Sequence, residues 1–162
     1  MSSRAKRNGA RRSPCNNFVY NTISMNTRQT KLSHIVETQY ISDEAGMCVV
    51  ECNKAVPFDI KRVYYIFNVD NSAIRGKHAH KKTKQMLFCI RGSVKVTLDN
   101  GEEREVVPLD KPHEGLYLDT LMWHEMFDFS KDAVLLVFAS EYFEEKDYIR
   151  KYDEFINYIQ NL

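Results

Sequence analysis

Short apolar segments separated by turn residues follow one another along the chain from residue 32 to residue 140. Apolar runs of this kind, alternating or continuous, are typical of β-strands. The segments with this character are 32–36, 47–51, 61–68, 85–91, 93–98, 105–109, 115–118, 122–129 and 133–140. Because many short strands occur at regular spacing without helical periodicity between them, the pattern favours a closed all-β sandwich or barrel over βαβ units.

The clearest hairpin in this pattern joins 93–98 to 105–109. The turn contains Asn100-Gly101, and Asn-Gly tolerates the positive φ angles that a tight turn requires. Apolar residues at 94, 96 and 98 alternate with Lys95 and Thr97. The alternation predicts an antiparallel strand with one face toward the core and the other toward water.

The C-terminal segment changes from strand-like to helical periodicity. Its apolar residues fall on one stripe of a helix, namely Tyr148, Ile149, Tyr152, Phe155, Ile156, Ile159 and Leu162. We therefore expect an amphipathic α-helix packed on the outside of the barrel, with its aromatic residues used for packing.

The chain has 162 residues, of which 43% are hydrophobic and 28% charged, as in an ordinary globular protein of one domain. No apolar run approaches the roughly 18 residues that span a bilayer, and no secretory signal core lies near the N-terminus. The four cysteines show no disulfide framework. We therefore expect a cytoplasmic protein with no membrane partner.

The N-terminal residues differ in composition from the rest of the chain. Residues 1–24 are rich in Arg, Ser and Asn without periodicity, which indicates a basic disordered extension. It could be an extension upstream of a functional start at Met25, a transit-like leader or a basic tail, and we favour the first. The single domain is then 25–162.

Residues 1–36 hold seven of the 23 basic residues and no acid, so the remainder carries 16 basic against 22 acidic residues. This balance excludes a globally basic nucleic-acid face in the folded part.

Candidate chemistry is concentrated between Arg75 and Gly92. His78 and His80 are separated by one residue, so both imidazoles leave the same face of an extended strand. Gly76, the His-x-His pair, a polar residue and then Gly92 resemble the first signature of the cupin β-barrel superfamily. The resemblance implies a cupin-type β-barrel, or jelly roll.

Strand parity predicts which other side chains share the interior with these histidines. In 61–68, Arg62 and Tyr64 alternate with Val63 and Tyr65, and in 122–129 His124 alternates with Trp123. Placing Tyr64, His78, His80 and His124 inward creates a cavity with three imidazoles, a phenol and the guanidinium of Arg62 or Arg75. Trp123 then lies outside the cavity.

Such a cavity has two chemical interpretations. Metal-binding cupins place a glutamate four to five residues after the His-x-His pair, but this position holds Gln85, a neutral and weak ligand. Three neutral histidines can still hold zinc, so a metal-dependent cupin remains an alternative. The second interpretation is metal-free proton transfer, because an imidazole can take a proton from carbon beside a carbonyl and return it. Plain hydrogen-bonded core histidines are a third possibility, although three of them with a tyrosine exceed the usual polarity of a core.

Several motifs in the right order resemble the dTDP-sugar 3,4-ketoisomerases, also called WxcM-like cupins. They are the segments 57–66, 75–82, 115–117, 123–126, 139–142 and 147–153, and the likeness covers about 32–162. The resemblance implies a dTDP-4-keto-6-deoxyhexose substrate, no cofactor and no metal. It also implies a homodimer whose N-terminal strand is exchanged between partners.

The same resemblance implies roles for individual residues. His78 is the expected general base at the sugar C-3, leading through an enediol to a ketone at C-3. Tyr64 is expected to shuttle a proton, and His80 and His124 to assist reprotonation. Arg75 is expected to hold a diphosphate or polarise the ketone. Arg62 and Gln85 are expected to form the wall of the substrate site.

We therefore expect dTDP-4-keto-6-deoxyglucose 3,4-ketoisomerase activity that supplies an aminotransferase and leads toward O-antigen or S-layer glycans. The alternatives are a metal-dependent cupin enzyme, a nucleotide-sugar 3,5-epimerase and a non-catalytic sugar-binding module. The configuration at C-4 is open from the sequence, and His124 as a proton donor tilts the expectation toward a galacto product.

Overall fold

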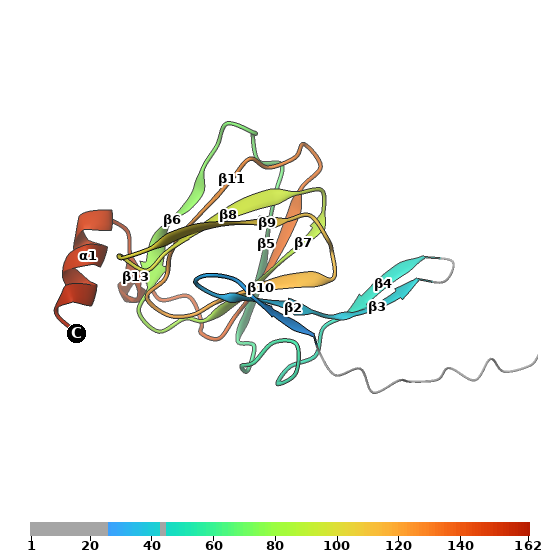
Figure 1. Ribbon diagram of the computed structural model, residues 1–162, viewed down its shortest axis with the longest axis horizontal. Coiled ribbons are helices and arrows are strands. Elements are labelled where there is room, and N and C mark those ends of the chain that lie inside the picture. The colour runs from blue at the N-terminus through green and yellow to red at the C-terminus, as the bar shows by residue number, and fades with distance from the viewer. Residues whose placement is uncertain (1–25, 43–44) are drawn as a thin grey trace, which may run out of the picture.

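Two antiparallel sheets form the molecule in the computed structural model, which describes residues 26–42 and 45–162 (Figure 1). The six-stranded sheet has the order β1 (Thr27–Gln29), β2 (His34–Glu37), β10 (Glu114–Leu118), β7 (Gln85–Arg91), β12 (Val134–Ala139), β5 (Arg62–Phe67). The five-stranded sheet has the order β13 (Tyr148–Ile149), β6 (Arg75–His80), β11 (Trp123–Phe127), β8 (Val94–Asp99), β9 (Arg104–Leu109). The hairpin of β3 (Gln39–Ser42) and β4 (Gly46–Val49) projects away from them. The predicted all-β, cupin-type barrel is confirmed.

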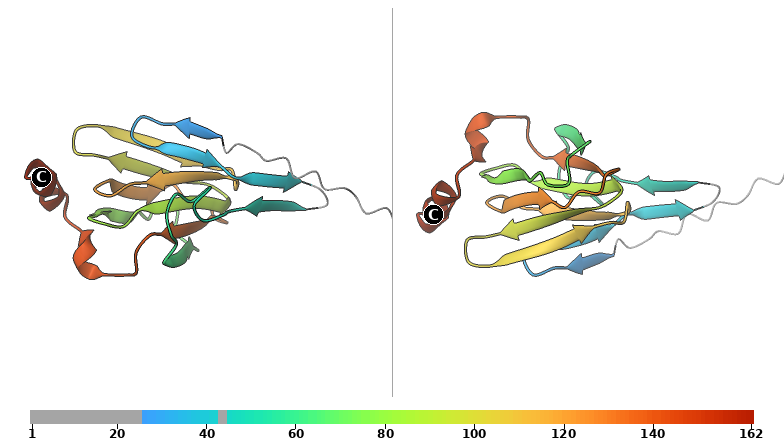
Figure 2. Two further views of the ribbon diagram at one scale, coloured as in Figure 1. Left: turned by 90° about the horizontal axis from the view of Figure 1, so that it is seen from below. Right: turned by 90° about the horizontal axis from the view of Figure 1, so that it is seen from above.

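The main core lies between the two sheets, which face each other as two layers (Figure 2). Alternate residues of each strand point inward, for example Leu87 and Cys89 of β7 and Val94 and Val96 of β8, and all four are at most 1% exposed. The barrel is therefore filled by side chains over most of its length.

Further apolar clusters cover parts of the outer faces. The loop between β4 and β5 buries Val56 and Phe58 against Met86 and Phe88 on the outside of the six-stranded sheet. On the outside of the five-stranded sheet, α1 (Tyr152–Gln160) buries Phe155 against Trp123. The prediction that Trp123 packs outside the cavity is thus confirmed.

Each segment predicted to be a strand overlaps one, and the 93–98 and 105–109 hairpin forms as β8 and β9 with Gly101 at φ +91°. The prediction that the face of β8 with Lys95 and Thr97 points toward water is wrong at Thr97, which is only 5% exposed. The C-terminal segment covers this end of the outer face, where the Tyr152 hydroxyl donates to Asp99.

The predicted C-terminal helix is correct in position but too long. Tyr148 and Ile149 form β13, which pairs with His80 and Ala79 of β6. The helix begins only at Tyr152. The strand replaces the first helical turn because the open edge of β6 offers backbone hydrogen bonds to these residues.

The predicted extension 1–24 and the start at Met25 lie outside the described residues. Within 26–42 and 45–162, no helix has the length and apolar character needed to cross a bilayer.

Candidate active site

Three histidine rings lie together inside the barrel on two neighbouring strands of the five-stranded sheet. His78 and His80 belong to β6, and His124 of β11 lies opposite His78 in the ladder. The ring centroid of His78 is 4.9 Å from that of His80 and 4.5 Å from that of His124. One ring nitrogen of each residue lies within 4.8 Å of the others. The structure therefore brings the three predicted imidazoles into one cluster.

A β-bulge in β6 places Arg75 on the same side of the sheet as His78. The ladder passes from His78 opposite His124 directly to Gly76 opposite Glu125, so Lys77 is the extra residue, and its φ angle is 56°. Glycine is required at position 76, where φ is +85° and a Cβ would lie 2.8 Å from the His124 carbonyl oxygen. The bulge therefore lets Arg75 and His78 line one pocket although they are three positions apart.

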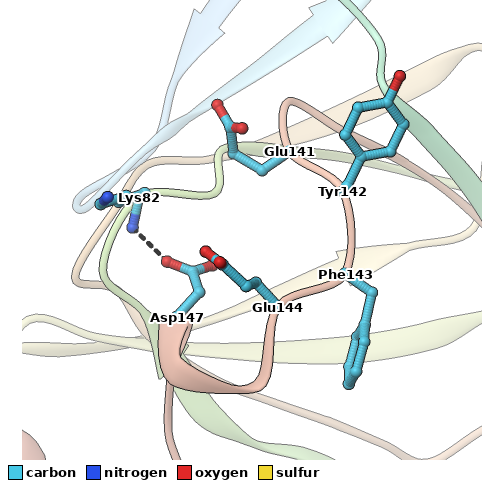
Figure 3. A pocket seen from close by; sticks show the side chains of 6 residues that line it. All are labelled: Lys82, Glu141, Tyr142, Phe143, Glu144 and Asp147. Atoms are coloured by element: carbon cyan, nitrogen blue, oxygen red, sulfur yellow. Dashed lines mark hydrogen bonds between the residues drawn. The ribbon is translucent and has the colours of Figure 1, made fainter.

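Asp147 orients the ring of His80. The carboxylate lies at the end of the 3-10 helix η1 (Glu145–Asp147), is 5% exposed, and accepts hydrogen bonds from three groups. The donors are His80 Nδ1 at 2.9 Å, the Lys82 backbone N–H at 2.7 Å and the Thr83 hydroxyl. Figure 3 shows Asp147 among the side chains that line a side pocket. This pocket has a volume of about 300 Å³. Burial raises the pKa of Asp147, but the hydrogen bonds outweigh burial and hold it below its ordinary value.

The protonation of His80 follows from these surroundings. Burial, with the neighbouring His78 adding to it, lowers the pKa of His80 to about 4, so the ring is neutral at neutral pH. Since the Asp147 carboxylate can only accept, the ring proton is on Nδ1 and Nε2 carries a lone pair. The fixed proton gives His80 one defined tautomer.

Gln85 links His80 to Tyr64. Its Nε2 lies 3.3 Å from His80 Nε2 and 2.9 Å from the Tyr64 hydroxyl oxygen, and the side chain is buried. The amide group therefore donates one hydrogen to each neighbour. Burial raises the pKa of Tyr64 to about 12, which keeps the phenol protonated at neutral pH.

The other two imidazoles are also neutral at neutral pH. Burial lowers the pKa of His124 well below its ordinary value, and His124 Nδ1 donates to the Met122 carbonyl at 3.1 Å. Burial likewise lowers the pKa of His78, and the charges of Arg150 and Arg62 act in the same direction. A neutral imidazole is the form that can act as a general base.

A pocket of about 650 Å³ opens in front of this cluster. Tyr64 and His78 reach it from opposite sheets, and the guanidinium groups of Arg62, Arg75 and Arg150 line it as well. His80, His124 and Gln85 are at most 2% exposed and lie behind His78, outside this lining. The arrangement therefore presents one imidazole to a ligand, together with three guanidinium groups and the tyrosines Tyr64, Tyr65 and Tyr148, and keeps the other two imidazoles and Gln85 behind them.

Arg62 is a partly buried cation without a counter-ion among the described residues. Its Nε and Nη2 atoms have no hydrogen-bond partner in that part of the chain, and Nη1 lies 3.5 Å from the Tyr148 hydroxyl. The guanidinium carbon lies 5.3 Å from the centre of the Tyr64 ring. Because an unpaired buried charge is costly, the site is suited to an anionic ligand or to negative charge that develops during a reaction.

The histidine cluster does not suit a resident metal ion in its present form. Three neutral imidazole nitrogens are within reach of one ion. However, the Gln85 amide hydrogen occupies the lone pair of His80 Nε2, and Asp147 binds the opposite side of that ring. An ion would have to displace the Gln85 amide from His80 Nε2. Because this amide is neutral, Gln85 could not serve as an anionic ligand for the ion.

Seven site residues were predicted from the sequence, and all lie in or directly behind this pocket. Arg62, Tyr64, Arg75 and His78 line it, whereas His80, Gln85 and His124 form the buried network. Asp147, Tyr148 and Arg150 were missed. The motif 147–153 contains these three residues and could have indicated them, but the spacing of its apolar residues was interpreted as the start of the helix.

The fold and the site define a cupin-type barrel enzyme with an imidazole and phenol pair in an arginine-lined pocket. The model of the family described as WxcM-like, C-terminal matches residues 28–160, and the chain belongs to this family. It is 48% identical over 129 residues to TDP-4-oxo-6-deoxy-alpha-D-glucose-3,4-oxoisomerase of Aneurinibacillus thermoaerophilus, covering 79% of this chain and 93% of that protein.

Solved structures agree with this assignment. The sugar 3,4-ketoisomerase QdtA of Thermoanaerobacterium thermosaccharolyticum in complex with TDP is 43% identical, with a TM-score of 0.78 over 82% of this chain and 98% of that one. The TDP-quinovose 3,4-ketoisomerase WlaRB of Campylobacter jejuni is also 43% identical, with a TM-score of 0.75 over 79% and 99% of the two chains. The expectation of an isomerase of the 3,4-ketoisomerase class is thereby confirmed.

Proposed function

We propose that the protein converts dTDP-4-keto-6-deoxyglucose into a dTDP-3-keto-6-deoxyhexose of galacto configuration, by proton transfer without a metal ion or cofactor. The observation that carries the proposal is the placement of His78. It alone of the three neutral imidazoles lines the pocket, and it faces Tyr64 from the opposite sheet. The names of the relatives support the substrate class.

The reaction requires one proton to move between carbons and one between oxygens. His78 takes the C-3 proton, which the neighbouring ketone acidifies, while Tyr64 donates its proton to the C-4 oxygen. The enediol that results has hydroxyl groups on both carbons. Tyr64 then recovers a proton from the C-3 oxygen, and His78 returns its proton to C-4, which leaves the ketone at C-3.

Arg62 supplies the positive charge that this step needs. Negative charge builds on the sugar oxygens as the C-3 proton leaves, and an unpaired buried guanidinium next to Tyr64 stabilises it. Arg75 and Arg150 are more exposed than Arg62 and line the same pocket, where they can hold the diphosphate. The partly buried Arg62 and the two more exposed arginines thus have different functions.

The galacto configuration follows if a single base serves both carbons. The C-3 hydrogen of the gluco substrate is axial on one ring face, and returning a proton to C-4 from that face leaves the C-4 hydroxyl axial. A gluco product would require a proton donor on the opposite face. His124, with His80, lies on the His78 side and supports one-face transfer.

The test is incubation with dTDP-4-keto-6-deoxyglucose in deuterated water, followed by NMR spectroscopy of the product. We expect a 3-keto sugar with an axial C-4 hydroxyl, in which C-4 carries deuterium to the extent that the His78 proton exchanges with the solvent between its removal from C-3 and its return to C-4. His78→Asn should abolish turnover and label incorporation while dTDP still binds. Normal exchange in this variant would refute the role of His78, and an equatorial hydroxyl would refute one-face transfer.

The same experiment separates the alternatives. A 3,5-epimerase would place deuterium at C-3 and C-5, and a sugar-binding module would bind without any exchange. A metal-dependent enzyme would lose activity after treatment with a chelator, whereas we expect no loss.

We further propose that the protein is a homodimer. Val63, Tyr65 and Phe67 of the edge strand β5 are each more than half exposed and form an apolar stripe, which supports association with a second copy. Light scattering after size exclusion should give twice the 19.0 kDa chain mass. A monomer mass at micromolar concentration would exclude the dimer.

A further inference from the structure

We propose that Gln85 is a positioning residue that sets the direction of the hydrogen bonds between His80 and Tyr64, and thereby directs the Tyr64 proton into the pocket. The inference rests on the proposed function for its kinetic consequences. The hydrogen-bond direction itself is a property of the protein without substrate.

The direction of these hydrogen bonds is set by Asp147, at the buried end of the series Asp147, His80, Gln85 and Tyr64. Asp147 accepts from His80 Nδ1, with 2.9 Å between the atoms. The neutral ring then presents a lone pair at Nε2, which only a donor can satisfy. Gln85 Nε2, 3.3 Å away, must therefore present a hydrogen to His80.

The remaining hydrogen of the same amide nitrogen is directed at Tyr64. The Gln85 Nε2 to Tyr64 oxygen distance is 2.9 Å, and the phenol oxygen acts as the acceptor. The hydroxyl hydrogen of Tyr64 is consequently not used in this contact. Because Tyr64 lines the pocket, the free hydrogen can be given to a ligand oxygen.

The chemistry of this position explains why an amide differs from a carboxylate here. A glutamate would accept from both neighbours, so it would draw the Tyr64 hydrogen away from the pocket and a second proton onto His80. A methionine has a similar shape but offers no hydrogen to either partner. Gln85→Glu therefore reverses the direction of the two hydrogen bonds, and Gln85→Met removes both of them.

Gln85→Glu is the decisive variant. With a carboxylate on each side of the ring, His80 should be an imidazolium at pH 7, which ¹⁵N NMR spectroscopy of labelled histidine detects directly. Turnover of the 4-keto sugar should fall about 100-fold with KM within about threefold of wild type, as for the loss of one acid–base contribution.

Gln85→Met is the matched control for shape. It should leave His80 neutral with its proton on Nδ1, and it should lower turnover about tenfold because the phenol loses its fixed orientation. A loss of packing alone would lower both variants equally and would leave the His80 spectrum unchanged in Gln85→Glu.

A neutral His80 at pH 7 in Gln85→Glu would overturn the inference, as would turnover within threefold of wild type in Gln85→Met. The second outcome decides the matter if Gln85→Glu does not fold. An inactive wild type would instead refute the proposed function, and the NMR comparison would still test Gln85.

Discussion

Acidification should destabilise this protein because His80 is held neutral in the folded state. Burial lowers the pKa of His80 to about 4, against an ordinary value of 6.5 that applies to the unfolded chain. Between these values the unfolded chain binds a proton that the folded protein does not. The free energy of unfolding therefore falls as pH drops through this window and is fully retained above it.

The two pKa values determine the size of the effect. The full difference corresponds to about 3 kcal/mol, and about 2.5 kcal/mol of it is lost between pH 8 and pH 4.5. With an m-value of about 2 kcal/mol per molar, the urea midpoint would move by about 1 M from this residue alone.

Urea unfolding of the wild type and of His80→Asn at both pH values isolates this contribution. The Asn side chain keeps an N–H donor for Asp147 but does not titrate, and the effects of titrating groups that do not interact with His80 cancel in the comparison. We expect the variant to lose about 2.5 kcal/mol less than the wild type on acidification. Equal losses in the two proteins would show that His80 is not neutral in the native state.

Two further predictions concern the partly buried cation and the helix. Arg62→Met should lower turnover about 100-fold and change dTDP affinity less than about threefold, because the guanidinium acts on the developing charge. Steady-state kinetics measures the turnover, and calorimetry with dTDP measures the affinity. A large loss of affinity would show that Arg62 binds the diphosphate instead. Phe155→Ala should cost about 3 kcal/mol in urea unfolding, since this fully buried ring anchors α1 on Trp123, and a cost under about 1 kcal/mol would mean that the helix is not docked.

The alternation of residue types along regular strands was sufficient to predict much of the site. In β5 the inward Tyr64 and the exposed Val63 and Tyr65 follow their sequence parity. Trp123 and His124 likewise lie on opposite faces of β11. Side chains on a regular strand can be assigned to faces because the period is fixed at two.

Features that depend on irregular backbone or on distant contacts could not be predicted in this way. Arg75 joins His78 only because Lys77 adopts a left-handed conformation, which a lysine in a strand does not suggest. Asp147 lies 67 positions from His80, and nothing local in the sequence links them. Tyr148 and Ile149 have helical spacing but pair with β6, since a free strand edge outweighs a short stretch of periodicity.

The extra residue in β6 makes the placement of Arg75 depend on whether the backbone at this point is bulged or regular. Removing Lys77 would restore an even count between Arg75 and His78, and both would still face the same wall in a regular ladder. Adding one residue would likewise give an even separation of four, whereas straightening the strand at its present length would send the guanidinium to the outer surface. A change of one residue in either direction therefore preserves the catalytic face in a regular strand, and only the present length depends on the bulge to keep it.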